Sequence, residues 1–384
     1  LTAVLTLAAT PAEMGVLAAH GSLPVLLIGL PAGAWVDRLR RRPLLIAADV
    51  GRALLLFSIP IAALLHALRI EHLYLVAVLA GALTVFFDAA DPAFLPAIVP
   101  PERLVEGNAK LGASDSLAEI AGPSLAGGLV HWLSAPIALA IDAATFIFSA
   151  LCLAAIRTPE PAPARQAEQR QSIGSEIVDG LRVVLRQPLL RALAGTMATF
   201  TFFGNFIGTL YSIYLLRVLQ VPTAVVGVLV GLGGVGALVG ALLVEPVARR
   251  FGLGKTLIAA MAFYGCTGLL IPLAGGPPFI AVGMLAIGQL VGDVAIAVYL
   301  INDVSLRQSV IPSSMLGRAN ASMQVLERGI GPLGALLAGL LGGSILLGMR
   351  GTILIGVLGV IASSLWLVFS PVRTLHIRET LAGW

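Results

Sequence analysis

The sequence has little charge, few cysteines and few aromatic residues for its length. Asp, Glu, Lys and Arg make up 11% of the 384 residues, whereas about a quarter of the residues of a soluble domain are charged. Two cysteines, Cys152 and Cys266, are too few for a disulfide framework or a zinc site, and the five histidines are scattered. These scarcities exclude an ordinary soluble domain and predict neither a metal nor another cofactor.

Hydrophobic residues, by contrast, make up 58% of the chain, and its mean hydropathy is +0.97. They form continuous runs rather than an alternating pattern, which predicts transmembrane helices rather than a β-barrel. The lipid bilayer is therefore the expected surroundings of the chain. We expect eleven full spans, near residues 13–36, 43–66, 73–97, 105–132, 135–156, 190–216, 223–247, 255–274, 279–304, 317–342 and 350–370.

The first nine residues are apolar but too few to cross a bilayer, and the chain does not begin with Met. We expect this segment to be the tail of a truncated first span, which gives twelve spans in the parent protein. It has neither the basic leader nor the cleavage-type ending of a signal peptide.

The basic residues predict the orientation of the spans. Of the 24 Lys and Arg residues, nineteen fall on one side, three on the other (Arg69, Arg217 and Arg350) and two inside spans (Arg52 and Arg328). Because cytoplasmic loops are enriched in Lys and Arg, the side with nineteen is expected to be cytoplasmic, together with the C-terminus. The net charge of +4 then reflects topology, and no nucleic acid is expected as a partner.

The chain divides into residues 1–156, a linker at 157–189 and residues 190–384. The linker begins with a stretch rich in Pro, Ala, Gln and Arg, followed from Ser172 to Pro188 by an amphipathic pattern. This pattern predicts an interfacial helix, or alternatively a soluble helix without lipid contact.

An internal repeat relates the two hydrophobic regions. Residues 100–111 align with residues 312–323 at an offset of 212, and both stretches contain Asn-Ala, at 108–109 and 320–321. Gly122-Pro123 and Gly331-Pro332 follow in the two regions at similar places. Repeats that enter the membrane from the same side predict two parallel six-helix halves.

Residues 33–42 follow the second span and read Gly-Ala-Trp-Val-Asp-Arg-Leu-Arg-Arg-Arg. A glycine followed four residues later by Asp-Arg and a basic cluster resembles the cytoplasmic signature of the major facilitator superfamily. Residues 87–100, with the Asn-Ala and Gly-Pro landmarks, are similar to the bacterial branch of macrolide-efflux and enterobactin-export proteins. Residues 240–250 are the counterpart in the second half and match this signature less well. Glu245 follows Gly240 by five residues, whereas Asp37 follows Gly33 by four.

This resemblance covers essentially the whole chain. It implies an all-α membrane protein with the major facilitator fold, which we expect to be a monomer in a bacterial cytoplasmic membrane.

The resemblance also implies a cytoplasmic gate that forms when the protein faces outward and breaks when it faces inward. Gly33 lets helices approach closely, and the charged residues can bond to partners on neighbouring helices. Anchoring of topology alone is the alternative role for the arginines. The predicted gate residues are Gly33, Asp37, Arg38, Arg41, Asp49, Arg52, Asp88 and Asp91.

Carboxylates inside spans are candidates for proton coupling. Asp293 lies near the middle of its span beside Gln289, where its carboxyl group could take up and release a proton as the exposure of a cavity changes. A structural hydrogen bond to a neighbouring helix is the alternative. Asp115, Glu119 and Glu327 are further candidates, for which structural pairing is the favoured role.

Gly122, Pro123 and Gly127 resemble the antiporter signature on the fifth helix of drug/proton exporters, although three residues rather than two separate the proline from the glycine pair. Such a proline kinks a span, and the glycines permit close packing. Gly331 and Pro332 are the repeat counterparts. A packing kink without bearing on the direction of transport is the alternative.

The seventh span is rich in aromatic and amide side chains. Phe202, Phe203, Asn205 and Tyr211, together with Gln289, are candidates for contact with an amphipathic small-molecule substrate. Helix packing explains the same residues as well.

Residues 231–236 fit the dinucleotide pattern GxGxxG, but they lie inside an apolar span without a preceding strand, which favours helix packing. No phosphate-binding loop and no catalytic constellation occur in the sequence, so we expect no enzyme. The sequence predicts a secondary transporter that exports drug, macrolide or siderophore-type molecules against protons. Uptake, or a membrane sensor or assembly protein without transport, are the alternatives.

Overall fold

The computed structural model describes residues 1–36, 39–100, 103–156, 181, 182, 184–311, 322, 323, 325–327 and 329–374. The described residues form helices and connecting loops and contain no strand. The predicted all-α class is thereby confirmed. Of the predicted linker, Leu181, Arg182 and residues 184–186 are helical, and most of the remainder lies outside the described residues.

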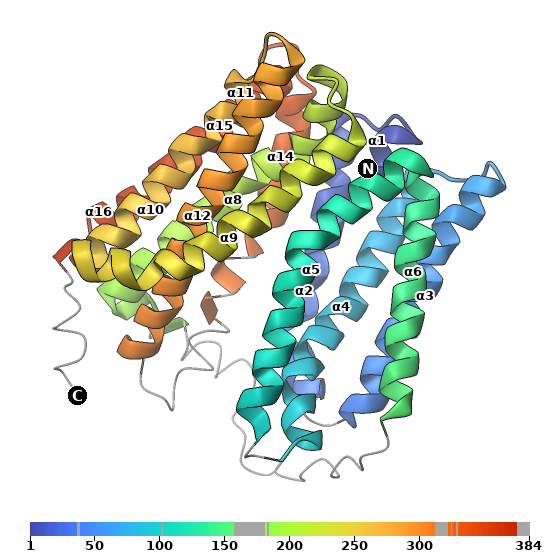
Figure 1. The fold of residues 1–384 in the computed structure, drawn as a ribbon, viewed down its shortest axis with the longest axis horizontal. Helices are drawn as coiled ribbons and strands as arrows, with labels where there is room; N and C mark the ends of the chain where they lie inside the picture. The colour runs from blue at the N-terminus through green and yellow to red at the C-terminus, as the bar shows by residue number, and fades with distance from the viewer. Residues whose placement is uncertain are drawn as a thin grey trace.

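The first half contains a short helix followed by five long ones (Figure 1). The short helix α1 lies within the first nine residues, which were predicted to be the tail of the first span. The bounds are α1 Thr2–Leu5, α2 Pro11–Val36, α3 Arg41–Leu64, α4 Ile70–Ile98, α5 Leu104–Trp132 and α6 Ala135–Ala155.

The second half contains the remaining helices, several of which are interrupted. Helix α8 passes into a π-helical turn, α10 is interrupted before α11, and α15 before α16. The bounds are α8 Pro188–Ile213, η2 Tyr214–Val218, α9 Thr223–Phe251, α10 Leu253–Gly268, α11 Leu270–Leu273, α12 Pro278–Val310, α14 Gly331–Gly342, α15 Gly348–Ser363, α16 Leu365–Val368 and the 3-10 turn η3 Pro371–Thr374.

Where the structure describes them, the eleven predicted spans coincide with helical structure, and ten of these stretches are long and apolar enough to cross a membrane. Helix α5 is not among the ten, although it has 29 residues. It carries Glu106, Lys110, Asp115 and Glu119, which lower its hydropathy. One predicted boundary was wrong by six residues: α12 continues to Val310, so Arg307 lies within a helix and not in a loop.

The repeat offset of 212 relates the helices of the two halves throughout. The first residues of α2 and α3, 11 and 41, correspond at this offset to 223 and 253, the first residues of α9 and α10. The short helix α1 corresponds to η2, and the last residue of α4, 98, corresponds to 310, the last residue of α12. The two halves therefore repeat the same arrangement of helices.

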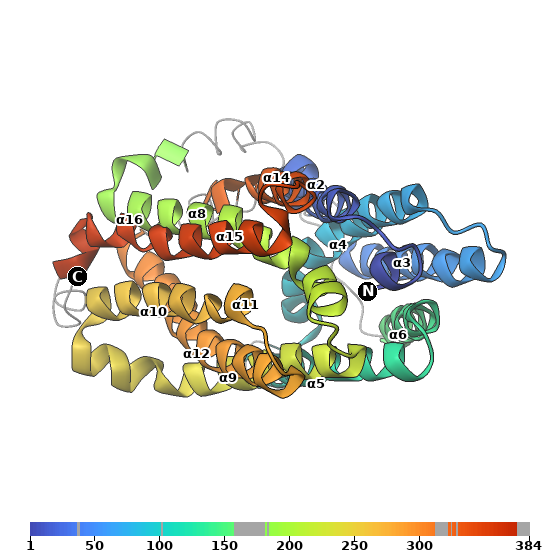
Figure 2. The same cartoon turned by 90° about the horizontal axis from the view of Figure 1, so that it is seen from above.

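Two helix pairs make the largest contacts between the halves: α2 packs on α14, and α5 packs on α9, with a smaller contact of α2 with α8. Helix α5 makes more contacts with α9 than with any helix of its own half. Figures 1 and 2 show α1 to α6 on one side of the molecule and α8 to α16 on the other. The hydrophobic clusters of buried residues lie mainly within each half, around Leu45 and Phe94 in the first and around Leu257 and Leu210 in the second.

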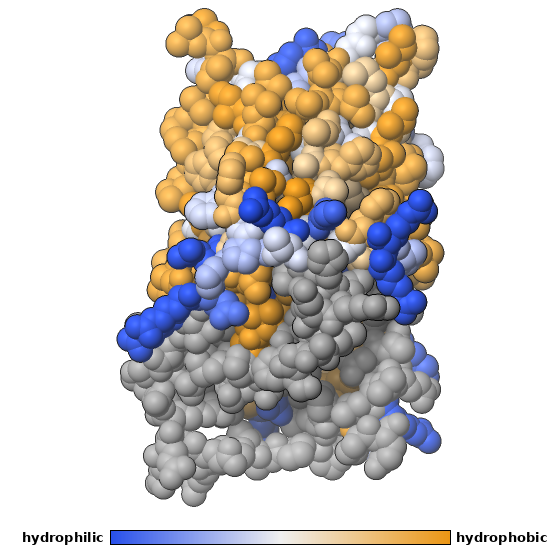
Figure 3. Space-filling view, turned by 90° about the vertical axis from the view of Figure 1, so that its left-hand side faces the viewer, coloured by the Kyte–Doolittle hydropathy of each residue, from blue (hydrophilic) through white to orange (hydrophobic). Residues whose placement is uncertain are grey.

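Large hydrophobic side chains are exposed along most of the long helices, as expected of surfaces that face lipid. Figure 3 shows such residues covering one side of the molecule, with hydrophilic residues gathered in a band at one level. We call the end where α3 and α10 begin the basic end, because Arg40 to Arg42, Arg249, Arg250 and Lys255 lie there. The other end, where α2 and α9 begin, is the opposite end.

Candidate functional site

Two of the predicted gate residues form a buried ion pair inside the first half. The Arg52 guanidinium donates to Asp49 one turn earlier on α3, and Asp49 is 1% exposed. The guanidinium also lies over the rings of Phe87 on α4 and Phe146 on α6, 4.3 and 4.5 Å from their centroids. A charge in this position is stabilised both by its counter-ion and by the two ring faces. Arg52 therefore links α3 to α4 and α6.

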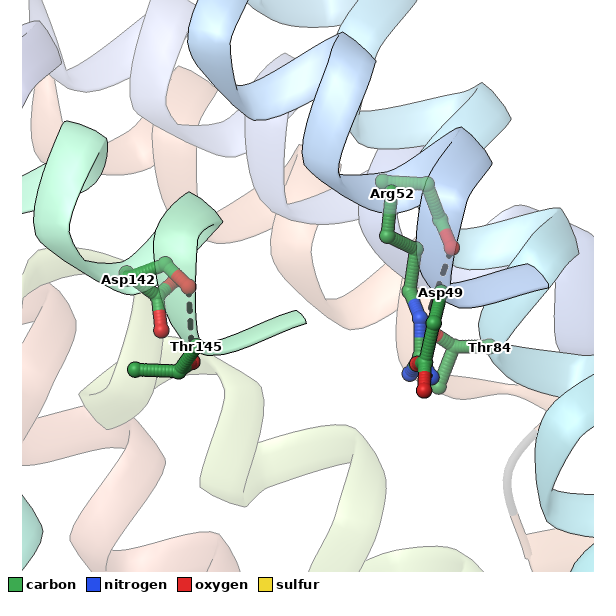
Figure 4. Close-up of polar contacts among 6 residues, drawn as sticks. Asp49, Arg52, Thr84, Asp142 and Thr145 are labelled. Carbon is green, nitrogen blue, oxygen red and sulfur yellow. Dashed lines mark hydrogen bonds and ion pairs between the residues drawn. The ribbon is translucent and has the colours of Figure 1, made fainter. Parts of the chain in front are cut away.

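Figure 4 shows Asp49 and Arg52 close to Thr84 of α4, with Asp142 and Thr145 on α6. The Thr145 hydroxyl donates to the Asp142 carbonyl at 2.7 Å, and the Thr84 hydroxyl donates to the Ala80 carbonyl at 2.9 Å. Both hydroxyls thus satisfy backbone groups of their own helices.

The other predicted gate residues lie toward the basic end. Asp88 and Asp91 on α4 are exposed, and Arg41 at the start of α3 is half-buried. Asp37 and Arg38 lie outside the described residues, and Gly33 lies in α2, near its end. The structure therefore unites Asp49 with Arg52, and the gate role of the whole set stays a prediction. The neighbouring Arg42 donates from Nε to the Leu153 carbonyl at 2.9 Å, at the end of α6.

Asp293 lies in the interior of the second half, beside a cavity of about 50 Å³. The Gln289 amide donates to Asp293 Oδ2 at 2.5 Å. Tyr211 of α8 and Tyr264 of α10 also line the cavity. On the other side, a Cβ atom on Gly233 of α9 would stand 2.1 Å from Asp293 Oδ2, so a side chain at position 233 would displace the carboxylate from this position.

This cavity has space for roughly three water molecules and contains polar partners for them. Asp293 and Gln289, predicted from the sequence as separate kinds of site, form one polar cluster with Tyr211. Their roles in coupling and substrate binding stay predictions.

A second group of buried charges, which the sequence analysis missed, lies toward the basic end of the second half. Arg307 of α12 pairs with Asp303 one turn earlier and with Glu327, whose Oε1 lies 2.8 Å from Arg307 Nη2. Asp303 is 1% exposed, and the other two side chains are nearly buried. The i, i+4 spacing of Asp303 and Arg307 could have revealed the pair. Glu327 is thus in a structural ion pair, and its coupling role stays a prediction.

The candidate substrate residues of α8 pack against other helices of the second half. Phe202, Phe203 and Phe206 form an aromatic cluster with ring centroids 5.0 to 5.6 Å apart. Phe203 lies against Gly359 of α15, and Asn205 donates to the Thr201 carbonyl of its own helix at 2.8 Å. These contacts account for helix packing, and substrate contact by the same residues stays a prediction. Asp115 and Glu119 lie on α5, with side chains outside the described residues.

Two glycine pairs bring the halves closest together, both at the opposite end. Gly127 of α5 meets Gly227 of α9, where a Cβ atom on Gly127 would stand 2.6 Å from the Gly227 Cα atom. Gly15 of α2 meets Gly339 of α14, where a Cβ atom on Gly15 would stand 2.8 Å from the Gly339 Cα atom.

The four glycines are related by the repeat, since the offset of 212 relates 15 to 227 and 127 to 339. Gly15 and Gly227 occupy one equivalent position in the two halves, and Gly127 and Gly339 occupy another. Each contact joins one position to the other, as in an interface with two-fold symmetry. Of these four among the 43 glycines of the chain, the sequence analysis singled out only Gly127, whose predicted close packing is found here; no sequence pattern indicated the other three.

The predicted kink residues fall into different environments. Pro123 lies inside the continuous helix α5, and its carbonyl faces Gly227, whereas Gly122 faces open space. Gly331 and Pro332 instead begin α14, directly after a turn at Ile330. At the offset of 212 that relates the helices, Gly122 and Pro123 correspond to Gly334 and Ala335, so their predicted correspondence with Gly331 and Pro332 was wrong by three residues. Their bearing on antiport stays a prediction.

Two arginines at the opposite end bind backbone carbonyls. Arg217 in η2 donates to the Val4 carbonyl of α1 at 3.3 Å, and Arg350 donates to the Ala274 carbonyl at 3.0 Å and to the Tyr214 hydroxyl at 3.1 Å. The Arg217 bond joins the two halves at the same end as the glycine pairs, whereas both Arg350 bonds lie within the second half. Toward the basic end, the two halves diverge (Figure 1).

Two repeated helical halves that meet at one end and diverge at the other define a multi-pass membrane protein of the secondary-transporter class. A sequence model of the Major Facilitator Superfamily matches residues 1–335. The chain belongs to this family of membrane transporters, which confirms the resemblance inferred from residues 33–42.

The chain is 31% identical over 268 residues to the uncharacterized MFS-type transporter y4rN of Sinorhizobium fredii. This alignment covers 67% of this chain and 64% of y4rN. It thus spans just under two thirds of that relative. The chain is 28% identical over 335 residues to the multidrug efflux pump Tap of Mycolicibacterium fortuitum, covering 85% of this chain and 80% of Tap.

Solved structures share the fold at low identity. A mutant of the nucleoside transporter NupG superposes with a TM-score of 0.77 at 13% identity, over 95% of this chain and 92% of NupG. A bacterial homologue of the iron transporter ferroportin superposes at 0.71 in its inward-facing state, with 17% identity over 95% and 91% of the two chains. In the outward-facing state the score is 0.53, with 18% identity over 91% and 88%.

Proposed function

We propose that this chain exports small amphipathic molecules across a bacterial cytoplasmic membrane in exchange for protons, with its basic end in the cytoplasm. The observation that carries the coupling is the position of Asp293 beside a small cavity within the second half, which Gln289, Tyr211 and Tyr264 line together with apolar residues. A carboxyl group held in a membrane interior is costly to keep charged, so its protonation can follow the access of water to the cavity. Tyr211, Tyr264 and Gln289 supply polar groups through which water can reach it.

Alternating access requires an interface that can close at one end while it opens at the other. The glycine pairs provide a closed contact at the opposite end, with little side-chain volume in the way. The exposed Asp88 and Asp91 lie toward the basic end, where the halves diverge. With the basic end in the cytoplasm, the protein is in an inward-facing state, in which a cytoplasmic gate would be broken.

The direction of transport rests on similarity. Tap is named a multidrug efflux pump, and its alignment covers 85% of this chain. The exporter-type landmarks at residues 87–100 and 122–128 favour the same direction. Macrolides, siderophores and other amphipathic compounds are therefore the substrates to test first.

The test uses everted membrane vesicles from an efflux-deficient bacterial host that produces the protein. A panel of macrolides, tetracyclines, lipophilic cations and siderophores is offered to energised vesicles. We expect at least one compound to accumulate, and a protonophore to abolish the accumulation. Asp293→Asn should reduce it to the level of vesicles without the protein, because this side chain can no longer carry a proton.

Asp142→Asn is the matched control, since it makes the same chemical change in a membrane helix remote from the cavity and should retain transport. Full activity of Asp293→Asn, or accumulation that a protonophore leaves intact, would refute the coupling mechanism. Intact cells that accumulate more of a compound when they produce the protein would instead identify an importer.

A further inference from the structure

A second cavity lies on the outside of the second half, between α8 and the helices α15 and α16. It has a volume of about 570 Å³ and is open at the surface. We call it the α8–α16 groove, and its lining residues are Pro188, Arg191, Ala192, Thr199, Ala362, Leu365, Trp366, Phe369, Ser370 and Pro371. The groove begins at the basic end, where α8 starts and α16 finishes, and has no part in the Asp293 cavity or the contacts between halves.

One wall of the groove is a tryptophan held in a fixed position. The Trp366 indole lies flat on α8 at Gly195, where a Cβ atom would stand 2.7 Å from the ring. Its Nε1–H donates to the Thr199 hydroxyl at 3.0 Å. Trp366 is nevertheless 48% exposed, and the nearby Phe369 is 82% exposed. Tryptophan with its polar edge satisfied and its ring exposed is typical of the membrane–water interface.

The charge at the mouth of the groove is positive. Arg191 lies in the first turn of α8 with an exposed side chain, which makes no ion pair or side-chain hydrogen bond with the residues that the structure describes. Arg373 is exposed in η3, two residues after Pro371 of the groove. A guanidinium can donate two parallel hydrogen bonds to a phosphate.

We propose that the α8–α16 groove binds an anionic phospholipid. The phosphate would bind Arg191 at the basic end, and an acyl chain would cover Leu365, Trp366 and Phe369. Free phosphate would bind the arginine but leave the apolar wall exposed, whereas a phospholipid would bind the arginine and also cover this wall. The proposal is independent of the direction and the coupling of transport.

The test follows the fluorescence of Trp366 in the protein in which Trp35, Trp132 and Trp384 are replaced by phenylalanine. This protein is reconstituted in vesicles of phosphatidylcholine to which brominated phosphatidylglycerol or brominated phosphatidylcholine is added in increasing proportion. We expect half-maximal quenching at a proportion of brominated phosphatidylglycerol about fivefold lower than of brominated phosphatidylcholine. This factor corresponds to about 1 kcal/mol, typical of one arginine near an anionic membrane surface.

Arg191→Gln should abolish this preference. Arg250→Gln is the matched control, because it removes an exposed arginine at the same end of the second half, outside the groove, and should retain the preference. Equal quenching by the two lipids, or equal effects of both substitutions, would overturn the proposal. So would relief of the quenching by inorganic phosphate beyond that by chloride at the same ionic strength, which would identify a site for a free anion.

A second measurement leaves the tryptophans in place. The unmodified protein and Arg191→Gln are released from nanodiscs of mixed phosphatidylglycerol and phosphatidylcholine and examined by native mass spectrometry. The unmodified protein should retain one more phosphatidylglycerol molecule than the variant. Identical numbers of retained lipids would contradict the proposal.

Discussion

The two halves of the chain have the same backbone plan but hold their buried charges on different helices. At the offset of 212, Asp49 and Arg52 of the first half correspond to Met261 and Tyr264, and Asp293 of the second half corresponds to Gly81. Gly81 faces the Gly21 carbonyl just as Asp293 faces Gly233, at equivalent places in the two halves. The duplicated backbone therefore fixes where helices meet, while single substitutions decide which half carries a charge there.

The difference extends to how each buried arginine is held. Arg52 has one carboxylate on its own helix and two aromatic rings on neighbouring helices, whereas Arg307 has two carboxylates, one of them across the gap from α12 to Glu327. Asp91 is the repeat counterpart of Asp303, but position 95, the counterpart of Arg307, is leucine. The ion pairs of the two halves are therefore not copies of each other.

The largest effect is expected from Arg307→Gln, because it leaves two buried carboxylates without their counter-ion. Removing one partner of a buried ion pair costs roughly 3–5 kcal/mol, and this substitution should fall at the upper end of that range. Thermal unfolding of the purified protein in detergent provides the measurement. Arg249→Gln is the control: it breaks an ion pair with Glu245 in which both side chains are more than 70% exposed, and its effect should be small. Equal losses in the two variants would contradict the structural role of Arg307.

A smaller loss is expected from Arg52→Gln, which leaves only Asp49 unpaired and retains packing between Phe87 and Phe146. The double substitution Asp49→Asn with Arg52→Gln should recover most of the lost stability, since it removes the uncompensated charge. The same thermal unfolding assay measures both variants. Additive losses in the double variant would show that Arg52 acts through its aromatic contacts rather than through Asp49.

The smallest effect should come from Gly127→Ala at the contact that the halves share. The added methyl group would overlap Gly227 in the closed interface, and overpacking of this kind costs about 1–3 kcal/mol. The equilibrium constant for closing the opposite end should fall roughly 5- to 150-fold, which corresponds to this cost in free energy. Spin labels at positions 133 and 220, on loops of the two halves at this end, would report a longer distance.

Gly122→Ala is the control for the same helix, because a Cβ atom on Gly122 has no neighbour within 4 Å. Its label distance should match that of the unmodified protein. If both variants lengthen the distance, helix propensity rather than the glycine contact determines closure.

Much of the fold could be predicted from the sequence. Apolar runs located the helices because lipid requires each span to satisfy its own backbone, and the match of residues 100–111 with 312–323 was enough to reveal the repeat offset. The contacts of Arg307 were missed because the predicted span ended at residue 304, six residues before the end of α12 and three residues before Arg307. Gly127 was singled out by its motif, but the other three interface glycines could not be, since the sequence of an apolar helix does not show which neighbour a small residue faces.

The candidate site was predictable to different degrees. Asp49 pairs with Arg52 three residues later, and Gln289 pairs with Asp293 four residues later. Both spacings bring side chains together on one face of a helix. The proximity of Tyr264 and Gly233 to Asp293 could not be predicted, because it depends on how α9, α10 and α12 pack together.

The crossed glycine contacts also bear on how such a chain could arise. Gly15 touches the repeat counterpart of Gly127, and Gly227 touches Gly127 itself. A half-length polypeptide with one glycine of each kind would make both contacts at once by pairing with an identical copy of itself, as in any symmetric homodimer. Gene duplication and fusion of such an ancestor would preserve this interface unchanged, and each copy would then be free to acquire its own buried charges.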